Sequence, residues 1–488
     1  MKDIRLRFAP SPTGYLHIGG LRTVLFSYLT AKSLGGKLIL RIEDTDQKRK
    51  VEGSDKKLIE ILKWCGIDFD EGAQIGGEYG PYVQSERRNI YDKQIQTLLD
   101  KGEAYHCFCS SEKLDKVRKE KQAKKLPPRY DRCCRDLSKD EVQKRIDDKE
   151  PYVIRQKMPL SGEVIAHDEL RGDIKFQAEE LEDHVLIKSD GMPTYQFANV
   201  VDDHLMEISH VTRAEEWIPS FPKNILLYKS FGWEAPKFIH FPVILSKTGG
   251  KLSKRQGDVA VEEFKSSGYI VPALINFNAL LGWHPEGDNE IFSIDEAIKL
   301  FDYRKIGTSP AVFDVEKLDY FNGYYIRQMD AMELLEVAKP FLLENIKVSS
   351  NSKKGEEKFL LGVVRAEQER LKKLSDIAEA TKFFFLDELD FDPMLLLWKK
   401  MIRSEAKENL GTIHSLLEKI PESNWTDDSI EDAIVTYLKA KELKVGTYLW
   451  PMRVALTGQK ASPGPFQVAE VLGKKETLDR VDKSIKKL

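Results

Sequence analysis

The stretch APSPTGYLHIGGLRT, residues 9–23, places two prolines, three glycines and one histidine between a candidate strand and a candidate helix. Residues 4–8 alternate between apolar and polar side chains, which predicts a strand. Apolar residues then recur three and four positions apart as far as Gly35, which predicts a helix, and residues 37–42 read as a second strand. Such a strand–helix–strand unit predicts an α/β fold with a parallel sheet, and a ligand crevice at the carboxyl ends of the strands.

His17 stands at the beginning of the predicted helix. Backbone N–H groups there have no partner within the helix and the helix dipole is positive, which suits an anion such as phosphate. Gly19 has no side chain, so a planar base can approach the backbone. The chain contains neither G-x-G-x-x-G nor G-x-x-x-x-G-K-[ST], so this corner predicts a different kind of nucleotide site.

A second candidate phosphate-binding element lies about 230 residues downstream, where residues 247–255 read KTGGKLSKR. Lys251 and Lys254 place two ammonium groups three residues apart, next to glycines that give the backbone freedom. A flexible cationic loop suits a triphosphate whose charge moves onto a leaving pyrophosphate. Each motif alone is a weak signal, but the two together in this order are a strong one.

The composition is that of a chain with large apolar cores. Its 488 residues are 41% hydrophobic and 32% charged, which fits two to four domains. We expect no membrane attachment and a cytoplasmic location, because no apolar run approaches spanning length and the first residues are too charged for a secretory signal. Five cysteines do not make a disulfide framework. Residues 112–145 hold thirteen Lys/Arg against seven Asp/Glu, and a solvated face is the simplest interpretation of that run alone.

Several segments resemble one enzyme family. HIGG at 17–20 and KLSKR at 251–255 resemble the two signature motifs of class I aminoacyl-tRNA synthetases. RFAPSPTGYLHIGG, LRIEDTD, DGMPTYQFANVVDD and VTRAEEWIPS resemble the glutamyl-tRNA synthetases of the bacterial type in particular. The resemblance runs from residue 5 to about residue 325, and continues more loosely to WPMRVALTG at 450–458. The first signature ends in Gly20 where the commoner pattern has a histidine, which removes one phosphate donor.

The resemblance implies ATP-dependent attachment of L-glutamate to tRNA-Glu, with Mg²⁺ bridging the phosphates. The α-carboxylate of glutamate would attack the α-phosphorus of ATP and release pyrophosphate, and the adenylate would then pass to the terminal ribose 2′-OH of the tRNA. Because the substrate carboxylate is itself the nucleophile, catalysis rests on positioning and charge stabilisation. Two alternatives stay open: an enzyme that also charges tRNA-Gln, and a non-catalytic tRNA-binding relative, which would be expected to lose His17 or the loop lysines.

The family's site residues transfer to this chain position by position. The catalytic set implied by the resemblance is His17, Lys251 and Lys254. The ATP-binding set adds Gly19, Gly20 and Trp217 to those three. The glutamate-binding set is Arg7, Ser11, Glu43, Tyr195 and Arg213. A substrate with two carboxylates and one ammonium needs guanidinium forks and an acid, which agrees with this set. Without the resemblance, Arg7 would be read as a surface arginine, Glu43 as a capping acid and Trp217 as a core aromatic.

Four cysteines fall in one basic segment. Cys107 and Cys109 are followed, after twenty-four intervening residues, by Cys134 and Asp136. Some members of the family bind zinc with two cysteines one residue apart, then a cysteine and a histidine. The resemblance therefore implies a structural Zn²⁺ held by Cys107, Cys109, Cys134 and Asp136, with Cys133 as a rival fourth ligand and free thiols as the alternative. The cations of this segment would contact tRNA phosphates.

The resemblance also implies a Rossmann-like catalytic domain, an inserted acceptor-end-binding domain and a C-terminal all-helical anticodon-binding region. The parts are the first half of the nucleotide fold (1–100), the inserted domain (101–188), the second half of the nucleotide fold (189–245), a signature-loop and stem-contact domain (246–323) and the helical region (324–488). Residues 183–203 read as strand-like runs that end at Asp202 and Asp203, while a helix near Ser404 carries apolar residues on one face. Arg370 aligns with an anticodon contact, an ordinary exposed arginine being the alternative. We expect a monomer whose partners are tRNA-Glu and L-glutamate.

Overall fold

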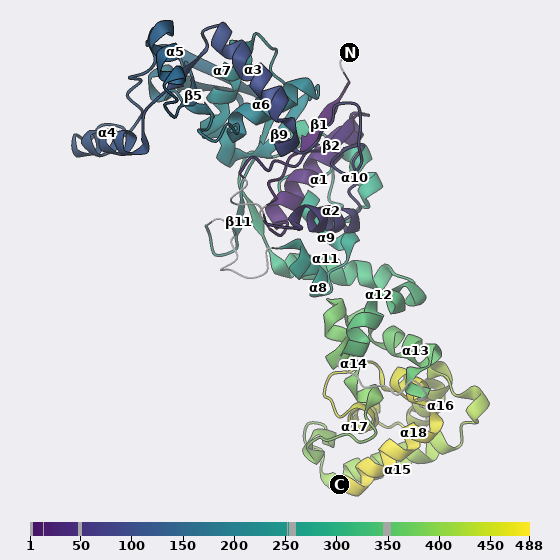
Figure 1. The fold of residues 1–488 in the computed structure, drawn as a ribbon. Helices are drawn as coiled ribbons and strands as arrows, with labels where there is room; N and C mark the ends of the chain where they lie inside the picture. The colour runs from purple at the N-terminus through teal and green to yellow at the C-terminus, as the bar shows by residue number, and fades with distance from the viewer. Residues whose placement is uncertain (1–2, 13, 47–50, 251, 253–259, 345–352) are drawn as a thin grey trace. The chain divides into compact units, whose positions relative to one another are not determined.

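The computed structural model describes residues 3–12, 14–46, 51–250, 252, 260–344 and 353–488. The chain divides into two compact units, each described by itself below (Figure 1). The first, here called the α/β unit, comprises Met1–Glu263 and Ile275–Asp314. The second, here called the helical unit, comprises Phe264–Leu274 and Val315–Leu488.

A seven-stranded sheet in the order β3-β2-β1-β9-β10-β6-β7 forms the centre of the α/β unit. Its strands are β1 (Arg5–Phe8), β2 (Lys37–Leu40), β3 (Glu71–Gly72), β6 (Glu163–Asp168), β7 (Gly172–Gln177), β9 (His210–Ala214) and β10 (Lys237–Phe241). All neighbours are parallel except β6 and β7. In β1, Leu6 lies opposite Leu38 of β2 and His210 of β9. The predicted parallel-sheet α/β fold is confirmed.

Helix α1 (Ile18–Ser33) joins β1 to β2, as the apolar spacing predicted. Its residues Leu21, Leu25 and Leu29 are fully buried, and each such burial stabilises the fold by about 1.5–3 kcal/mol. The ring of Phe26 packs edge-on against Phe241 of β10 with centroids 5.1 Å apart. This contact fixes the helix across the sheet.

Two expectations for the middle of the chain were wrong. Residues 163–177, assigned to the inserted domain, form β6 and β7 at the edge of the main sheet. Residues 195–205 form helix α6 (Tyr195–Leu205) rather than a strand, so Asp202 and Asp203 lie on a helix. The apolar residues Phe197, Val200 and Val201 follow the helical period, and the two buried carboxylates that follow them hid it.

A smaller antiparallel sheet, in the order β4-β5-β8, carries the predicted cysteine segment. Its strands are β4 (Ala104–Cys107), β5 (Val153–Gln156) and β8 (Val185–Ile187). A parallel pair, β11 (Ile244–Ser246) and β12 (Ala311–Phe313), flanks the second signature segment. The other helices of the α/β unit are α2 (Ser54–Trp64), α3 (Arg88–Asp100), α4 (Ser111–Ala123), α5 (Lys139–Asp147), α7 (Phe221–Phe231) and α10 (Ile294–Leu300).

The helical unit contains helices and no strand among its described residues, so the predicted all-helical C-terminal region is confirmed. Its helices are α11 (Val315–Gln328), α12 (Ala331–Glu344), α13 (Glu357–Glu367), α14 (Ile377–Phe385), α15 (Arg403–Glu418), α16 (Asp427–Ala440), α17 (Val445–Thr457) and α18 (Pro465–Lys487). Helices α8 (Val261–Ser266) and α9 (Val271–Ala279) each cross a division between the units. Helix α11 runs through the boundary expected after Gly323. Nowhere in the described chain is a helix long and apolar enough to cross a membrane.

His184, just before β8, makes the α/β unit sensitive to acid. Burial, with the charges of Lys223 and Arg155, lowers the pKa of His184 to about 3. The folded state therefore binds this proton more weakly than the unfolded state, whose histidine pKa is about 6.5. The contribution to stability is complete above pH 6.5 and is lost as the pH falls, by about 2 kcal/mol at pH 5.

We therefore expect the urea midpoint of the wild type to fall between pH 7 and pH 5, and that of His184→Phe to fall by less. The same substitution at His284, which is exposed, is the matched control and should retain the full drop. Identical pH dependence in His184→Phe and the wild type would contradict the assignment.

Candidate active site

A cavity of about 470 Å³ lies where β1 and β9, which are neighbours in the sheet, reach their carboxyl ends. Helix α1 leads from β1 to β2 on one side, while β9 belongs to the second half of the fold, so this is the position where parallel sheets bind ligands. Eight of the predicted site residues line it: Arg7, Ser11, His17, Gly19, Gly20, Tyr195, Arg213 and Trp217. The structure therefore brings together most of the residues that the family resemblance singled out.

His17 forms the N-cap of helix α1, as its position in the sequence predicted. Its backbone is extended, and its Nδ1 accepts a hydrogen bond from the Gly19 backbone N–H at 3.0 Å. A Cβ added to Gly20 would lie 2.9 Å from Leu16 Cδ1, so packing within the corner also favours glycine there. The imidazole is thus fixed at the positive end of the helix, facing the cavity.

Leu252 of the second signature segment, and Ala260 a few residues after it, lie at the same corner. Lys251 and Lys254 lie outside the described residues, but Leu252 lines the cavity and its N–H donates to Ile244 O at 3.2 Å. After the segment, Ala260 pairs with His17 in an antiparallel bridge. Two motifs about 230 residues apart in the sequence therefore meet at one cavity.

Arg7, which lines the cavity, belongs to a buried network of ion pairs. Arg7 Nε donates to Asp203 Oδ1 at 2.9 Å, and Arg41 Nη1 donates to the same oxygen at 2.7 Å. Arg41 Nη2 donates in turn to Glu43 Oε1 at 2.8 Å. Although burial opposes its charge, the carboxylate of Asp203 keeps the pKa of Arg7 above the ordinary value. The Arg7 guanidinium is therefore a fixed, paired cation at the cavity wall.

Glu43 belongs to this network rather than to the lining of the cavity. Its Oε1 also accepts from Asn199 Nδ2 at 3.0 Å, whereas its buried Oε2 has no hydrogen-bond partner among the described residues. Burial raises the pKa of Glu43, and the charges of Arg41 and Arg7 oppose that rise. Glu43 Oε2 is therefore a buried acceptor that makes no hydrogen bond among the described residues.

Arg213, unlike Arg7, makes no hydrogen bond with a carboxylate among the described residues. It is buried, its Nε donates to His240 Nε2 at 2.9 Å, and neither terminal nitrogen makes a hydrogen bond within the described chain. Burial lowers the pKa of Arg213. Beside it, the Tyr195 ring stacks on Trp217 with centroids 4.6 Å apart, and burial raises the pKa of Tyr195 to about 12. These groups form a cationic, aromatic-walled end of the cavity.

Several residues of the site were not predicted. Arg22 lines the cavity and donates to the carbonyl oxygens of Leu281 and Pro242, and burial lowers its pKa to about 10. Its spacing from Ile18 placed it on the buried face of the predicted helix, which could have drawn attention to it. Asp203 gave no such signal, because its partners Arg7 and Arg41 are far away in the sequence.

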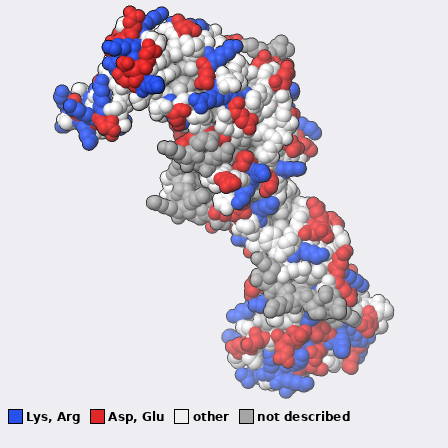
Figure 2. Space-filling view, in the orientation of Figure 1, with Lys and Arg blue, Asp and Glu red and all other residues white. Residues whose placement is uncertain are grey.

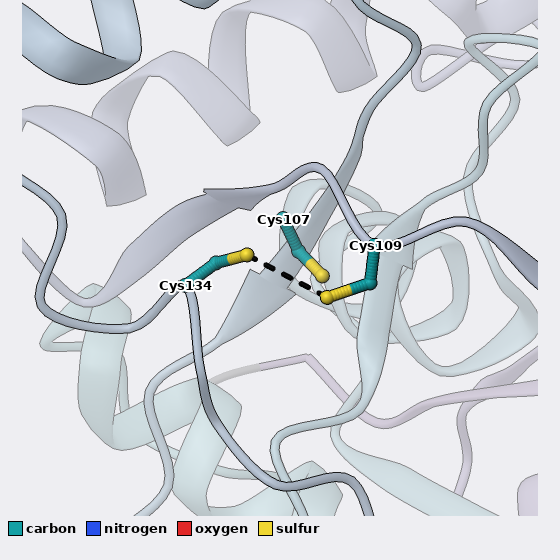
Figure 3. A group of neighbouring side chains, drawn as sticks. All are labelled: Cys107, Cys109 and Cys134. Atoms are coloured by element: carbon teal, nitrogen blue, oxygen red, sulfur yellow. Dashed lines mark hydrogen bonds between the residues drawn. The ribbon is translucent and has the colours of Figure 1, made fainter. Parts of the chain in front are cut away.

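Three sulfurs of the predicted metal set come together at the small sheet (Figure 3). The Sγ atoms of Cys107, Cys109 and Cys134 all lie within 4.8 Å of one another, with Cys109 and Cys134 3.6 Å apart. Cys133 Sγ lies 3.2 Å from Cys109 Sγ and 3.9 Å from Cys134 Sγ. Asp136 is exposed and is not part of this group. A hydrogen bond with Cys134 lowers the pKa of Cys107 to about 4.

Helix α4 lies between Cys109 and Cys133 in the chain and carries the first part of the basic run. None of its residues is buried, and it stands out from the rest of its unit (Figure 1). Its Lys and Arg side chains are exposed together with acidic and uncharged ones (Figure 2). In the helical unit, Arg370 donates to Glu367 Oε1 at 2.9 Å and to Ser462 O at 2.6 Å, and its side chain is 40% exposed.

Comparison with known proteins agrees with this geometry. Residues 3–320 match the family described as "tRNA synthetases class I (E and Q), catalytic domain", and residues 333–485 match "Anticodon binding domain". A glutamate–tRNA ligase of Clostridium botulinum is 46% identical over 99% of this chain and 98% of its own length. One of Dehalococcoides mccartyi is 43% identical over 100% of this chain and 98% of its own.

Among solved structures, "a glutamate tRNA ligase from Elizabethkingia meningosepticum CCUG26117 in complex with its amino acid" superposes with a TM-score of 0.89. It is 38% identical, and the match covers 99% of both chains.

Proposed function

The chain belongs to the class I tRNA synthetase family of the E and Q type, and from this premise we propose that it is a glutamate–tRNA ligase, acting in the cytoplasm through a glutamyl-adenylate. One observation carries the proposal. The cavity that holds the His17 corner and Leu252 also holds Arg213, a buried cation whose terminal nitrogens have no hydrogen bond among the described residues. A corner suited to the phosphates of a nucleotide and a pocket suited to a carboxylate therefore share one cavity, as adenylate formation requires.

Each side chain has a role in this reaction that follows from its contacts. Arg213 and Tyr195 hold the side-chain carboxylate of glutamate, because a guanidinium fork matches a carboxylate. Arg7, held by Asp203, faces the same substrate. Glu43, the acid of the predicted glutamate-binding set, lies in the network behind the cavity wall and contributes there by holding Arg41. With substrate held in this way, its α-carboxylate is aimed at the phosphate site without any side-chain nucleophile.

The phosphates lie toward the other end of the cavity. His17, Gly19 and Gly20 bind ATP at the start of helix α1, and Trp217, at the Arg213 end of the same cavity, completes the ATP-binding set. Lys251 directly precedes Leu252 in the sequence, and Lys254 falls between Leu252 and Ala260. The two ammonium groups stabilise the charge that develops on the leaving pyrophosphate. Mg²⁺ arriving with ATP would neutralise phosphate charge.

Glutamate acceptance on purified tRNA-Glu and tRNA-Gln, measured separately, tests this function. We expect ATP-dependent charging of tRNA-Glu. Charging of both would make the enzyme one of mixed specificity, and charging of neither, with RNA binding intact, would leave a non-catalytic relative. The cations of helix α4 are proposed to contact the acceptor end, and Arg370 the anticodon; the monomeric state remains a prediction.

We also propose that the cysteine cluster holds one structural zinc. In a tetrahedral thiolate site with Zn–S bonds of about 2.3 Å, the sulfurs lie about 3.8 Å apart. The spacings of 3.6 and 3.9 Å from Cys134 to Cys109 and Cys133 fit that figure, whereas the 3.2 Å between Cys109 and Cys133 is shorter. Cys133 is therefore a better candidate than Asp136 for the fourth ligand, and Lys113 Nζ, 3.1 Å from Cys133 Sγ, would offset thiolate charge. Such an ion would stabilise the fold of this segment and take no part in the chemistry.

We expect about one zinc per chain by elemental analysis. Cys133→Ser should release the ion to a chromophoric chelator at least tenfold faster than the wild type. Losing even a residue that only supports a metal ligand typically lowers metal affinity roughly 10–100-fold. Asp136→Asn should leave release unchanged, and Cys65→Ala is the control for an unrelated buried cysteine. Absence of zinc with four titratable thiols would leave free cysteines, and faster release only in Asp136→Asn would assign that residue instead.

A further inference from the structure

Arg213 is connected to a carboxylate through a histidine. On the parallel pair of β9 and β10, Arg213 lies directly opposite His240, and its Nε donates to His240 Nε2 at 2.9 Å. The other ring nitrogen, Nδ1, lies 2.7 Å from Asp168 Oδ2, at the end of β6. These three residues on three adjacent strands form a continuous buried chain of hydrogen bonds that ends in the cavity.

The contacts determine where the proton of the imidazole lies. Arg213 Nε can only donate, so His240 Nε2 must be the acceptor and carries no proton. Asp168 accepts from the backbone N–H groups of Leu170 and Arg171 through Oδ1 and of His240 through Oδ2, each at 3.0 Å. A carboxylate used in this way accepts the remaining bond too, so the proton lies on Nδ1. Both ends of the chain therefore require the same neutral tautomer.

The surroundings agree with a neutral ring. His240 is 0% exposed and packs against the ring of Phe221, with centroids 4.8 Å apart, while the ring of Phe238 lies 6.2 Å away. Burial lowers the pKa of His240, the hydrogen bond with Asp168 opposes that effect, and the charge of Arg213 acts in the same direction as burial. No solvent can replace either of its hydrogen bonds at this depth.

Arg7 and Arg213, the two arginines of the predicted glutamate-binding set, are both held through Nε but by different partners. Arg7 Nε donates directly to the carboxylate of Asp203, which cancels much of its charge. Arg213 Nε donates to an uncharged ring, which fixes the guanidinium in direction without pairing it with a carboxylate. With Nε occupied, the edge that carries Nη1 and Nη2 is the one available for a planar carboxylate.

We propose that His240, held in its Nδ1–H tautomer by Asp168, is a positioning residue that aims Arg213 at the side-chain carboxylate of glutamate without itself supplying a counter-charge to the guanidinium. This inference rests on the proposed glutamate site. It predicts that the acceptor at the position of Nε2, rather than the ring as such, sets the affinity for glutamate.

Two variants separate these possibilities in ATP–pyrophosphate exchange. His240→Gln keeps an acceptor near the position of Nε2 but loses the bond to Asp168, and should keep the glutamate KM within about threefold of wild type. His240→Asn keeps a donor for Asp168 but leaves Arg213 Nε without an acceptor, and should raise the glutamate KM by roughly tenfold or more, with a smaller change in kcat. The ATP KM should stay the same in both, and both should lose thermal stability to a similar extent. Equal glutamate KM values in the two variants would overturn the inference.

Arg213→Ala separates this inference from the proposed function. If that variant leaves the glutamate KM unchanged, the pocket assignment itself fails. If it raises the glutamate KM while His240→Asn does not, only the role of His240 fails. If either His240 variant is unfolded, ¹⁵N-histidine NMR of the wild-type protein provides the readout. An unprotonated Nε2 on His240 supports the inference, and a proton on Nε2 overturns it.

Discussion

Lys254→Ala is expected to lose at least about a hundredfold in ATP–pyrophosphate exchange, the loss typical of removing one charge-stabilising donor from a transition state. The structure supports this expectation through the neighbours of Lys254. Leu252 lines the cavity and Ala260 pairs with His17, so the segment between them begins and ends at the proposed phosphate site. Because the ammonium serves the leaving phosphates rather than the RNA, tRNA binding should change by no more than a few-fold.

Lys247→Ala is the matched control for this prediction. Lys247 lies in the same basic run, but it is 59% exposed and its Nζ pairs with Asp314 Oδ2 at 3.5 Å. Its removal takes away the same charge from the run without touching the residues between Leu252 and Ala260. Exchange activity in Lys247→Ala should therefore remain close to wild type. Wild-type exchange in Lys254→Ala, or an equal loss in both variants, would contradict the role given to the loop.

The opening of the fold could be predicted from the sequence because its signals are local. The alternation in residues 4–8 and the helical spacing after Leu16 are both readable within twenty residues, and β1, α1 and the His17 cap follow. The same holds for α15, where the apolar spacing predicted the buried face of Leu410, Ile413 and Leu417. Local periodicity reports what a segment buries, whichever partner it buries it against.

The order of the strands and the charged interior could not be predicted in this way. The place of β6 beside β10 depends on pairing across about 70 residues, which leaves no local mark. Asp203 was read as the polar end of a strand because a charged residue normally faces water. Its buried position depends on Arg7 and Arg41, more than 160 residues away in the chain. The partners of Arg213 were missed for the same reason, since Asp168 and His240 meet only in the folded sheet.

The second large effect concerns the choice of amino acid, and falls on Arg213. Glutamate and glutamine have nearly the same shape, so packing alone cannot separate them. Glutamine would place an NH₂ against a guanidinium that can only donate, and would leave a buried cation without its counter-charge. Truncating one partner of such a pair typically costs on the order of 2–5 kcal/mol. Arg213→Ala should therefore raise the glutamate KM at least about thirtyfold and narrow the preference over glutamine.

Arg213→Lys sharpens the argument, because it keeps the charge and removes the fork. A lysine ammonium cannot donate to His240 Nε2 and present two parallel donors to a carboxylate at the same time. If orientation through His240 matters as much as charge, lysine should rescue glutamate binding poorly while still disfavouring glutamine. Exchange kinetics with both amino acids, in the wild type and the two variants, would decide the matter. An unchanged glutamate KM and selectivity in Arg213→Ala would remove Arg213 from the pocket, and full rescue by lysine would show that charge alone makes the discrimination.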